Sequence, residues 1–219
     1  MELILEFFKN FIFEIIYTII FSSGVLIFFT RKMRRTIDAK SVGIKCIHKR
    51  GKDVKHLQNS VKKSKQIKMI SFMPFYFVFD HKEQLVKKIR EGCSIKFLVC
   101  NKDMPLLKDL CQIERHVDND IANLFEQLIN LLSSIKKDAG DDATGSIEVR
   151  TYNTEIRNPA TICYEQDEHI SAYLTVSTPP KRSIDVIMLE YADDDCQPII
   201  DYFDAIWNRH CNDVVLKLK

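Results

Sequence analysis

The chain has 219 residues, and 32 Lys and Arg nearly balance 30 Asp and Glu, so its formal net charge is only +2. Its seven cysteines are an odd number and include no CxxC pair, which excludes a disulfide framework or a zinc-ribbon spacing as the basis of the fold. The sequence therefore predicts no structural disulfide, no metal and no cofactor.

The first feature along the chain is an apolar run over residues 11–30, in which Glu14 is the only charged residue and no Pro occurs. An α-helix needs about 20 such residues to cross the hydrocarbon core of a bilayer, so the run predicts a transmembrane helix. A buried core helix is one alternative, but it would normally show a polar stripe. The predicted membrane-spanning side chains include Phe11, Ile15, Ile19, Ser22, Ser23, Gly24, Leu26 and Phe29.

A basic stop follows the run directly and consists of Arg31, Lys32, Arg34 and Arg35. A secretory signal peptide, the other alternative, carries its positive charge before the apolar run, and here the order is reversed. Under the positive-inside rule, the N-terminus lies outside and the rest of the chain lies in the cytoplasm. The predicted location is therefore the cell inner membrane, crossed once.

Positive charge continues beyond the stop. Residues 31–69 hold 14 Lys or Arg and two acids, whereas residues 70–219 hold 17 Lys or Arg and 25 acids. A basic cluster beside a span is attracted to anionic lipid by about 1 kcal/mol per residue, which predicts the lipid bilayer as a partner. Nucleic-acid binding is the competing interpretation of such charge, and no direct nucleic-acid contact is assigned.

Short apolar segments then alternate with amphipathic ones, which predicts an α/β fold with a mixed sheet flanked by helices. The predicted elements up to residue 100 are a strand over 41–48, a helix over 53–64, a strand over 67–73 that runs into a loop, a helix over 80–90 and a strand over 94–100. Gly92 ends the second helix, and the apolar strand follows at once. This order is typical of a βαβ unit with a parallel pair of strands.

Pro105 opens a long helical region, in which apolar residues from Leu106 to Ile135 recur in steps of four and three. The narrow seam indicates a helix that packs along a partner, either within a helical pair over one face of the sheet or against another copy of the chain. The remaining predicted elements are strands over 146–152, 160–165, 169–176 and 183–190, and a helix with its apolar face at 199–207. The acidic residues 193–195 favour the N-terminus of that helix.

This order of elements resembles the phospholipase D-like fold. The segments that carry the resemblance are the strand and loop over 67–79, the helix and strand over 82–99 with Glu91-Gly92 between them, Glu148-Val-Arg-Thr-Tyr, residues 169–176 and Tyr202-Phe-Asp-Ala-Ile-Trp207. The resemblance covers most of residues 40–210. It divides the chain into an anchor with its basic stop (1–35), a basic juxtamembrane segment with the first strand and helix (36–66), and a cytoplasmic α/β domain (67–219).

Active phospholipase D-like enzymes carry an H-x-K motif followed by an Asp, in which the His attacks phosphorus and the Lys stabilises phosphate charge. Only His169 remains here, because Ser171 stands at the Lys position and Val176 at the Asp position. The sequence also lacks a Walker loop, a dinucleotide fingerprint, G-x-S-x-G and H-E-x-x-H. His169 is therefore the one weak catalytic candidate, and the chain is predicted not to be an enzyme.

The anchor, the cytoplasmic domain and the incomplete catalytic set together resemble bacterial antiphage membrane effectors, such as the transmembrane proteins encoded beside retron reverse transcriptases. The resemblance implies an abortive-infection effector that disrupts the inner membrane when a regulatory protein or nucleoprotein complex releases it. Self-association through the 106–135 seam would bring several spans together, and Ser22, Ser23 and Gly24 allow close helix approach. The alternatives are a membrane-tethered phosphodiesterase or nuclease that uses His169, and a non-catalytic membrane adaptor.

Overall fold

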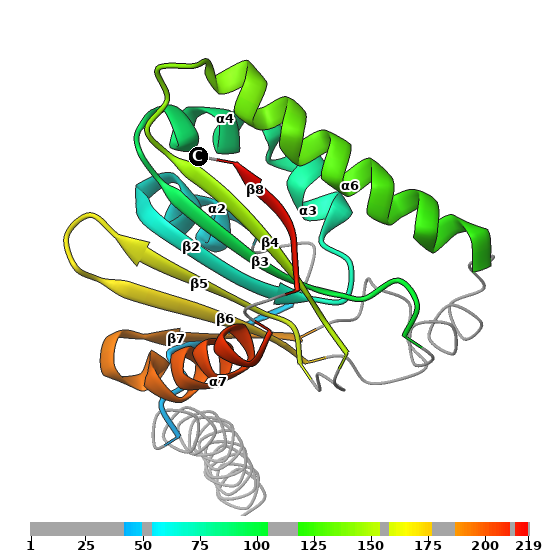
Figure 1. Cartoon of the computed structure of the whole chain (residues 1–219). Helices are drawn as coiled ribbons and strands as arrows, with labels where there is room; N and C mark the ends of the chain where they lie inside the picture. The colour runs from blue at the N-terminus through cyan, green and yellow to red at the C-terminus, as the bar shows by residue number, and fades with distance from the viewer. Residues whose placement is uncertain are drawn as a thin grey trace, which may run out of the picture. The chain divides into compact units, whose positions relative to one another are not determined.

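The structure, a computed structural model, describes residues 42–49, 54–104, 118–153, 158–176, 187–210 and 213–218. Ile44–Lys219 form one structural unit, and a mixed eight-stranded sheet with the order β1-β7-β6-β5-β2-β3-β4-β8 runs through it (Figure 1). The strands are β1 (Cys46–Lys49), β2 (Ser64–Ser71), β3 (Ser94–Cys100), β4 (Ser146–Tyr152), β5 (Ala160–Glu165), β6 (Ile170–Val176), β7 (Ile187–Ala192) and β8 (Val214–Leu218). The helices are α2 (Val54–Lys63), α3 (Phe75–Asp80), α4 (Lys82–Arg90), α6 (Asp118–Ala139) and α7 (Gln197–Arg209), with a 3-10 turn η2 (Asp193–Cys196) before α7.

The centre of the sheet is parallel and consists of β2, β3 and β4, in which Ile67, Ile95 and Ile147 stand side by side. β3 ends in the buried apolar run Phe97–Cys100, whereas β2 and β4 carry charged residues such as Lys68 and Glu148 between their buried apolar residues. α3 and α4 lead from β2 to β3, and α6 lies between β3 and β4 in the chain. The parallel pair predicted from the helix, Gly92 and the following strand is confirmed.

Antiparallel strands extend this centre on both sides. β5, β6, β7 and β1 follow on one side, and β8 pairs with β4 on the other. β8 was not predicted, and β7 extends to Ala192, two residues beyond the predicted end of its strand. β1 is an edge strand of four residues, and its partner in the sheet is β7.

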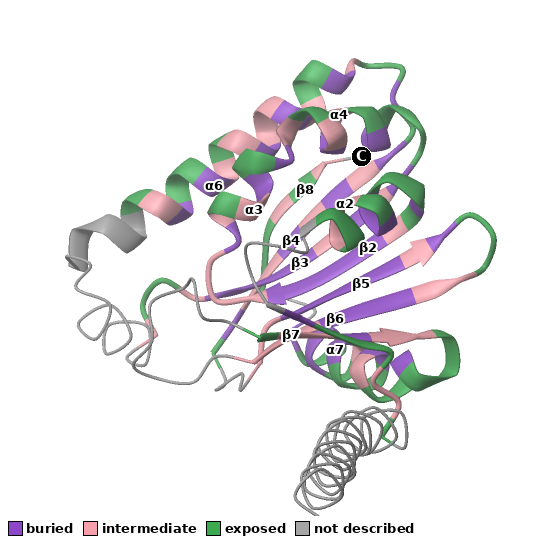
Figure 2. Ribbon diagram, turned by 180° about the vertical axis from the view of Figure 1, so that it is seen from behind, coloured by how far each residue is buried: buried purple, intermediate pink, exposed green. Residues whose placement is uncertain are grey.

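Two layers of helices cover the two faces of the sheet. α2, α3, α4 and α6 lie on one face and α7 lies on the other (Figure 1; Figure 2). Phe97 packs in the first core with Leu128 and Leu132 of α6, whereas Leu98 packs in the second core with Phe203 of α7. Because alternate residues of a strand point to opposite faces, the neighbours Phe97 and Leu98 belong to different cores.

The described part of the predicted helical seam faces the sheet. Leu128 and Ile135 of the seam are buried in the first core and Leu131 packs against it, beside the buried Phe125 and Leu132, so this part of the seam packs within the chain. Residues 105–117, where the seam begins, lie outside the described residues. Self-association through the seam stays a prediction.

Two glycines set the beginnings of β3 and β4. Gly92 has a φ of +84°, a left-handed conformation that ends α4 and that other residues rarely adopt. Gly145 precedes β4, and a Cβ there would lie 2.5 Å from the carbonyl oxygen of Ile89. With both turns fixed, β3 and β4 start in register at Ser94 and Ser146.

The aromatic segment after Pro74 was predicted to be a loop, but it forms α3. Proline is tolerated at the start of a helix because the first N–H groups have no partner within the helix. His81 separates α3 from α4, so the predicted helix over 80–90 begins at Lys82. The loop prediction was wrong because it took the proline as a break and not as a start.

Among the described residues, no helix is both long enough and apolar enough to span a membrane. α6 has the length, with 22 residues, but its exposed side chains include Glu126, Lys137 and Asp138, which are costly to place in hydrocarbon. The described part of the chain is therefore a mixed α/β sheet flanked by helices, and the predicted fold with a transmembrane helix is corrected. The predicted single-pass location in the inner membrane is likewise not supported. The predicted span (residues 11–30) and the basic stop (residues 31–35) lie outside the described residues, and the three-part division of the chain stays a prediction.

Candidate metal centre

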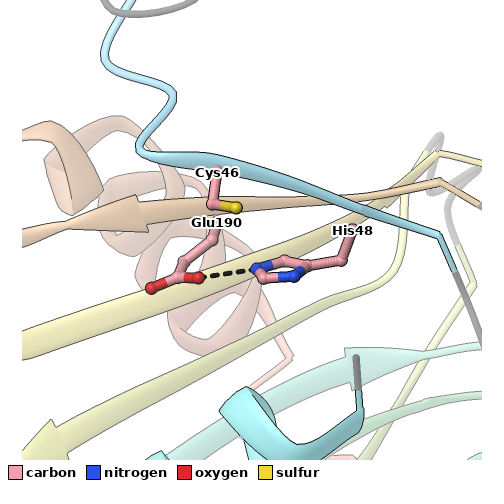
Figure 3. A group of neighbouring side chains, drawn as sticks. All are labelled: Cys46, His48 and Glu190. Atoms are coloured by element: carbon pink, nitrogen blue, oxygen red, sulfur yellow. Dashed lines mark hydrogen bonds and ion pairs between the residues drawn. The ribbon is translucent and has the colours of Figure 1, made fainter. Parts of the chain in front are cut away.

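The edge strand β1 presents Cys46 and His48 on the same face, because residues two apart in a strand point the same way. β7 runs antiparallel beside β1, with Glu190 opposite Cys46 and Met188 opposite His48. The pairing brings together an imidazole and a carboxylate that lie 142 residues apart in the sequence. Figure 3 shows the thiol of Cys46 beside this pair.

The three side chains are close enough to share one ion. Nε2 of His48 lies 2.6 Å from Oε2 of Glu190, and one ligand atom from each of the three residues lies within 4.8 Å of the other two. Ligands at about 2.0–2.3 Å from a tetrahedral ion are roughly 3.5 Å apart, which small side-chain rotations would reach here. His48 and Glu190 are buried and Cys46 is exposed, so solvent reaches the group at the thiol.

Glu190 is a buried carboxylate whose charge is balanced by its neighbours. Burial by itself raises the pKa of a carboxyl group, but hydrogen bonds from His48 and Lys45 outweigh burial and hold the pKa of Glu190 below its usual value. Nζ of Lys45 lies 3.0 Å from Oε1, and Nε2 of His48 donates to Oε2. Glu190 is therefore ionised at neutral pH, as a metal ligand must be.

A layer of buried polar side chains adjoins Glu190 beneath α2. Tyr173 of β6 stands opposite Glu190, and its hydroxyl lies 3.0 Å from Oγ of Ser60. Ser60 donates to Oγ of Ser171 at 3.4 Å, and Ser171 donates to Oε1 of Glu165 at 3.3 Å. Burial raises the pKa of Tyr173 to about 12, so its hydroxyl stays protonated. These bonds hold the strand β6 and the helix α2 together beside the three candidate ligands.

His56 stands in the first turn of α2, and the centroid of its ring lies 4.9 Å from that of His48. Its side chain is exposed, so the ring can rotate without breaking a packed core. Three protein ligands leave one position of a tetrahedral ion open. His56 or a water molecule would complete the coordination.

The donor set indicates which ions fit. Thiolate and imidazole ligands suit zinc and neighbouring transition metals, whereas Mg²⁺ and Ca²⁺ take oxygen ligands almost alone. Sequence analysis missed this group because it searched for ligand pairs at zinc-finger spacing. The available signal was the alternation of Cys46 and His48 in a predicted strand, but nothing local to Glu190 shows that its strand lies beside them.

His169, the weak catalytic candidate, lies in the turn before β6. Its Nδ1 donates to Oδ1 of Asp193 at 2.6 Å, and the backbone N–H of Ile170 donates to the same oxygen at 3.2 Å. The bond from Ile170, followed by that from His169, holds the pKa of Asp193 below its usual value. Glu168 and Asp193 both have positive φ angles, 68° and 52°. His169 thus joins the turn between β5 and β6 to η2, and Ser171, at the motif's Lys position, is buried in the polar layer.

No protein-family model matches the chain, and no curated protein matches it in sequence. A solved structure that resembles it is that of TrmBL2, described as an archaeal chromatin protein with a novel mode of DNA binding. The TM-score is 0.45 and the identity is 11%, over 86% of this chain and 63% of that chain. At this level, the likeness does not assign a function.

The predicted resemblances to phospholipase D-like proteins and to antiphage membrane effectors are corrected, because no family model and no curated protein of either kind matches the chain. The physical reason is that an alternation of strands and helices is shared by many unrelated α/β proteins, and only a motif would have distinguished them. The lipid bilayer likewise gains no support as a partner.

Proposed function

We propose that this domain is a non-catalytic binding domain for a divalent transition-metal ion of the zinc class. Cys46, His48 and Glu190 are the ligands. The observation that carries the proposal is their grouping, with three ligand atoms within 4.8 Å of one another on two paired strands. A carboxylate that is buried and ionised beside a thiol and an imidazole is a donor set that favours such an ion.

The polar groups around the ligands support binding and not catalysis. Ser60, Ser171 and Tyr173 bond to one another, and Lys45 pairs with Glu190, so these side chains are occupied in holding the layer together. The proposal therefore shares the non-enzymatic character that was predicted from the sequence. The membrane effector and the membrane adaptor both need a spanning helix, and the span predicted for them lies outside the described residues.

A metal ion in this place would fasten the edge strand to the rest of the sheet. β1 has four residues and pairs with β7, so few backbone hydrogen bonds hold it. An ion that binds the folded state alone adds about 2.7 kcal/mol of stability when its concentration is 100 times the Kd. The domain would therefore respond to metal through the attachment of β1.

Titration of the full-length protein with Co²⁺ tests the proposal, because a cobalt–thiolate bond gives a charge-transfer absorption. We expect this absorption to saturate at one equivalent, Zn²⁺ to displace Co²⁺, and Tm to rise with Zn²⁺ but not with Mg²⁺. Cys46→Ser should abolish the absorption, and Glu190→Gln should weaken Zn²⁺ binding by at least about tenfold, as the loss of a ligand does.

His169→Gln is the matched control, because it removes a histidine that is hydrogen-bonded to a carboxylate outside the three-residue group. It should leave the absorption and the Zn²⁺ affinity unchanged. His56→Ala separates a fourth ligand from a water, since it should weaken binding only in the first case. Wild-type protein with neither the absorption nor a Zn²⁺-dependent Tm would refute the proposal.

A further inference from the structure

Lys45 stands directly before Cys46, the first candidate ligand, and makes two contacts with Glu190, the third. Its backbone N–H donates to the carbonyl oxygen of Glu190 at 2.8 Å, and its Nζ lies 3.0 Å from Oε1 of the same residue. The Lys45 side chain is 52% exposed and that of Glu190 is 4% exposed. The ammonium group therefore reaches from solvent onto a buried carboxylate.

We infer that Lys45 is a resident cation that competes with the metal ion for Glu190. In the metal-free protein its ammonium group neutralises the carboxylate, and in the metal-bound protein the ion takes over that role while the ammonium group swings out. The inference rests on the proposed metal site and names the residue that sets its affinity.

The two oxygens of Glu190 explain why the exchange is needed. Oε2 accepts from His48 and Oε1 faces Lys45, so both are engaged before a metal arrives. A buried carboxylate without a compensating charge is strongly unfavourable, which makes such a partner necessary in the metal-free state. A divalent ion on the same carboxylate would stand a few ångströms from the ammonium group, and the two positive charges repel.

The geometry also provides for the departure of Lys45. Because half of its side chain is exposed, the ammonium group can move into solvent and be hydrated there when it leaves Glu190. Asp193, whose side chain is 60% exposed, lies within electrostatic reach, since the charge of Lys45 contributes to its lowered pKa after the bonds from Ile170 and His169.

Lys63 gives a matched control on the same layer. Its Nζ lies 3.7 Å from Oε2 of Glu165, with side-chain exposures of 66% for Lys63 and 4% for Glu165. Lys63→Met thus removes an exposed lysine that pairs with a buried glutamate, as Lys45→Met does. Its glutamate, Glu165, is not one of the candidate ligands. A general effect of positive charge would appear equally in both variants.

The test is the Zn²⁺ affinity of full-length wild type, Lys45→Met, Lys45→Arg and Lys63→Met, each measured at low and high salt. Lys45→Met should bind about tenfold more tightly than wild type, which corresponds to about 1.4 kcal/mol. Lys45→Arg keeps the charge and should stay within about threefold of wild type, as should Lys63→Met. The gain should shrink as salt rises, because salt screens exposed charges.

The metal-free Tm gives an independent readout. Without metal, Lys45→Met should have a lower Tm than wild type, since Glu190 loses its partner. With saturating Zn²⁺, the Tm of Lys45→Met should equal that of wild type with saturating Zn²⁺. If wild type binds Zn²⁺ and Lys45→Met binds no more tightly, the competition is overturned while the metal site stands. An equal gain in Lys63→Met also overturns the competition, and a failure of both wild type and Lys45→Met to bind overturns the metal site itself.

Discussion

The two ends of the sheet bury different chemistry on the face covered by α2, α3, α4 and α6. Under α3, α4 and α6, the strands β2, β3 and β4 present apolar side chains such as Phe97 and Val149. Under α2, the strands β6 and β7 present Ser171, Tyr173 and Glu190, all of them buried. Figure 2 shows β2 and β3 mostly as buried and β7 mostly as intermediate, so the polar end is also the less buried of the two.

The comparison separates the apolar end, which stabilises the fold, from the polar end, which contains the candidate metal ligand Glu190. Apolar burial stabilises by about 25 cal/mol per Å², so the apolar end can account for folding without any ligand. Burying a polar group costs free energy unless the group is hydrogen-bonded. At the polar end, Ser60, Ser171 and Tyr173 form such hydrogen bonds with one another, and these bonds offset the cost of burial. Natural sequences depart from apolar cores mainly at functional positions, and this difference supports the polar end as the site.

The largest expected effect is at the apolar end. Phe97→Ala removes a fully buried ring and should lower the free energy of unfolding by about 3–5 kcal/mol, measured by urea denaturation. Phe97→Leu keeps most of the packing and should cost clearly less. A loss below about 1 kcal/mol in Phe97→Ala would show that the first core is not what holds the fold.

A second prediction concerns Lys68 of β2, a buried lysine on the opposite face of the sheet, which α7 covers. Burial alone would lower the pKa of Lys68, but hydrogen bonds to Asp204 and Tyr164 outweigh it and raise the pKa. Asp204→Asn leaves this charge, at 7% exposure, without its partner and should cost about 1–3 kcal/mol. The cost should fall toward the lower figure, because the Asp204 side chain is 43% exposed and solvent screens the pair.

Lys68→Met is the comparison variant, because it replaces the ammonium group that lies over the Tyr164 and Phe203 rings by an uncharged side chain that can still pack against them. It should be close to neutral. Since the pKa of Lys68 is raised, the pair's contribution is fully present below the ordinary lysine pKa of about 10.4 and declines as pH rises through the higher value in the folded protein. Equal stability losses in Asp204→Asn and Lys68→Met would contradict this account.

A third, smaller effect is expected at the polar end. Tyr173→Phe removes the hydroxyl that lies 3.0 Å from Ser60 and should cost about 1 kcal/mol in thermal or urea unfolding. Tyr152→Phe is the counterpart on the other face, where the hydroxyl donates to the carbonyl oxygen of Ser71 at 3.3 Å. Its longer bond should cost less. A neutral Tyr173→Phe would show that the polar layer contributes little to holding α2.

The smallest effect is expected at His169. Its bond to Asp193 is at the surface, so His169→Ala should change stability by no more than about 1 kcal/mol. Zn²⁺ affinity, measured by competition with a chelating dye, should remain within about threefold of wild type, because His169 is not one of the three ligands. A tenfold loss of affinity would extend the site to the turn before β6 and weaken the contrast between the two ends.

Local sequence was sufficient to predict the central elements. The helix that ends at Gly92 and the strand Ser94–Cys100 follow from hydrophobic spacing and from a glycine in a left-handed conformation. The same reasoning failed at the aromatic segment after Pro74, where packing on the first core decides for a helix. It also predicted a transmembrane helix over residues 11–30, which lie outside the described residues, and no described helix can span a membrane.

By itself, the sequence determined the alternation of strands and helices, because each element needs only its own apolar period and its end signals. Only the tertiary structure decided that β7 lies beside β1. Strand pairing depends on the closure of a long loop and on register across the whole sheet, and neither is encoded within the strand itself. Cys46, His48 and Glu190 became neighbours through that pairing, which is why the candidate metal centre was visible only in the folded chain.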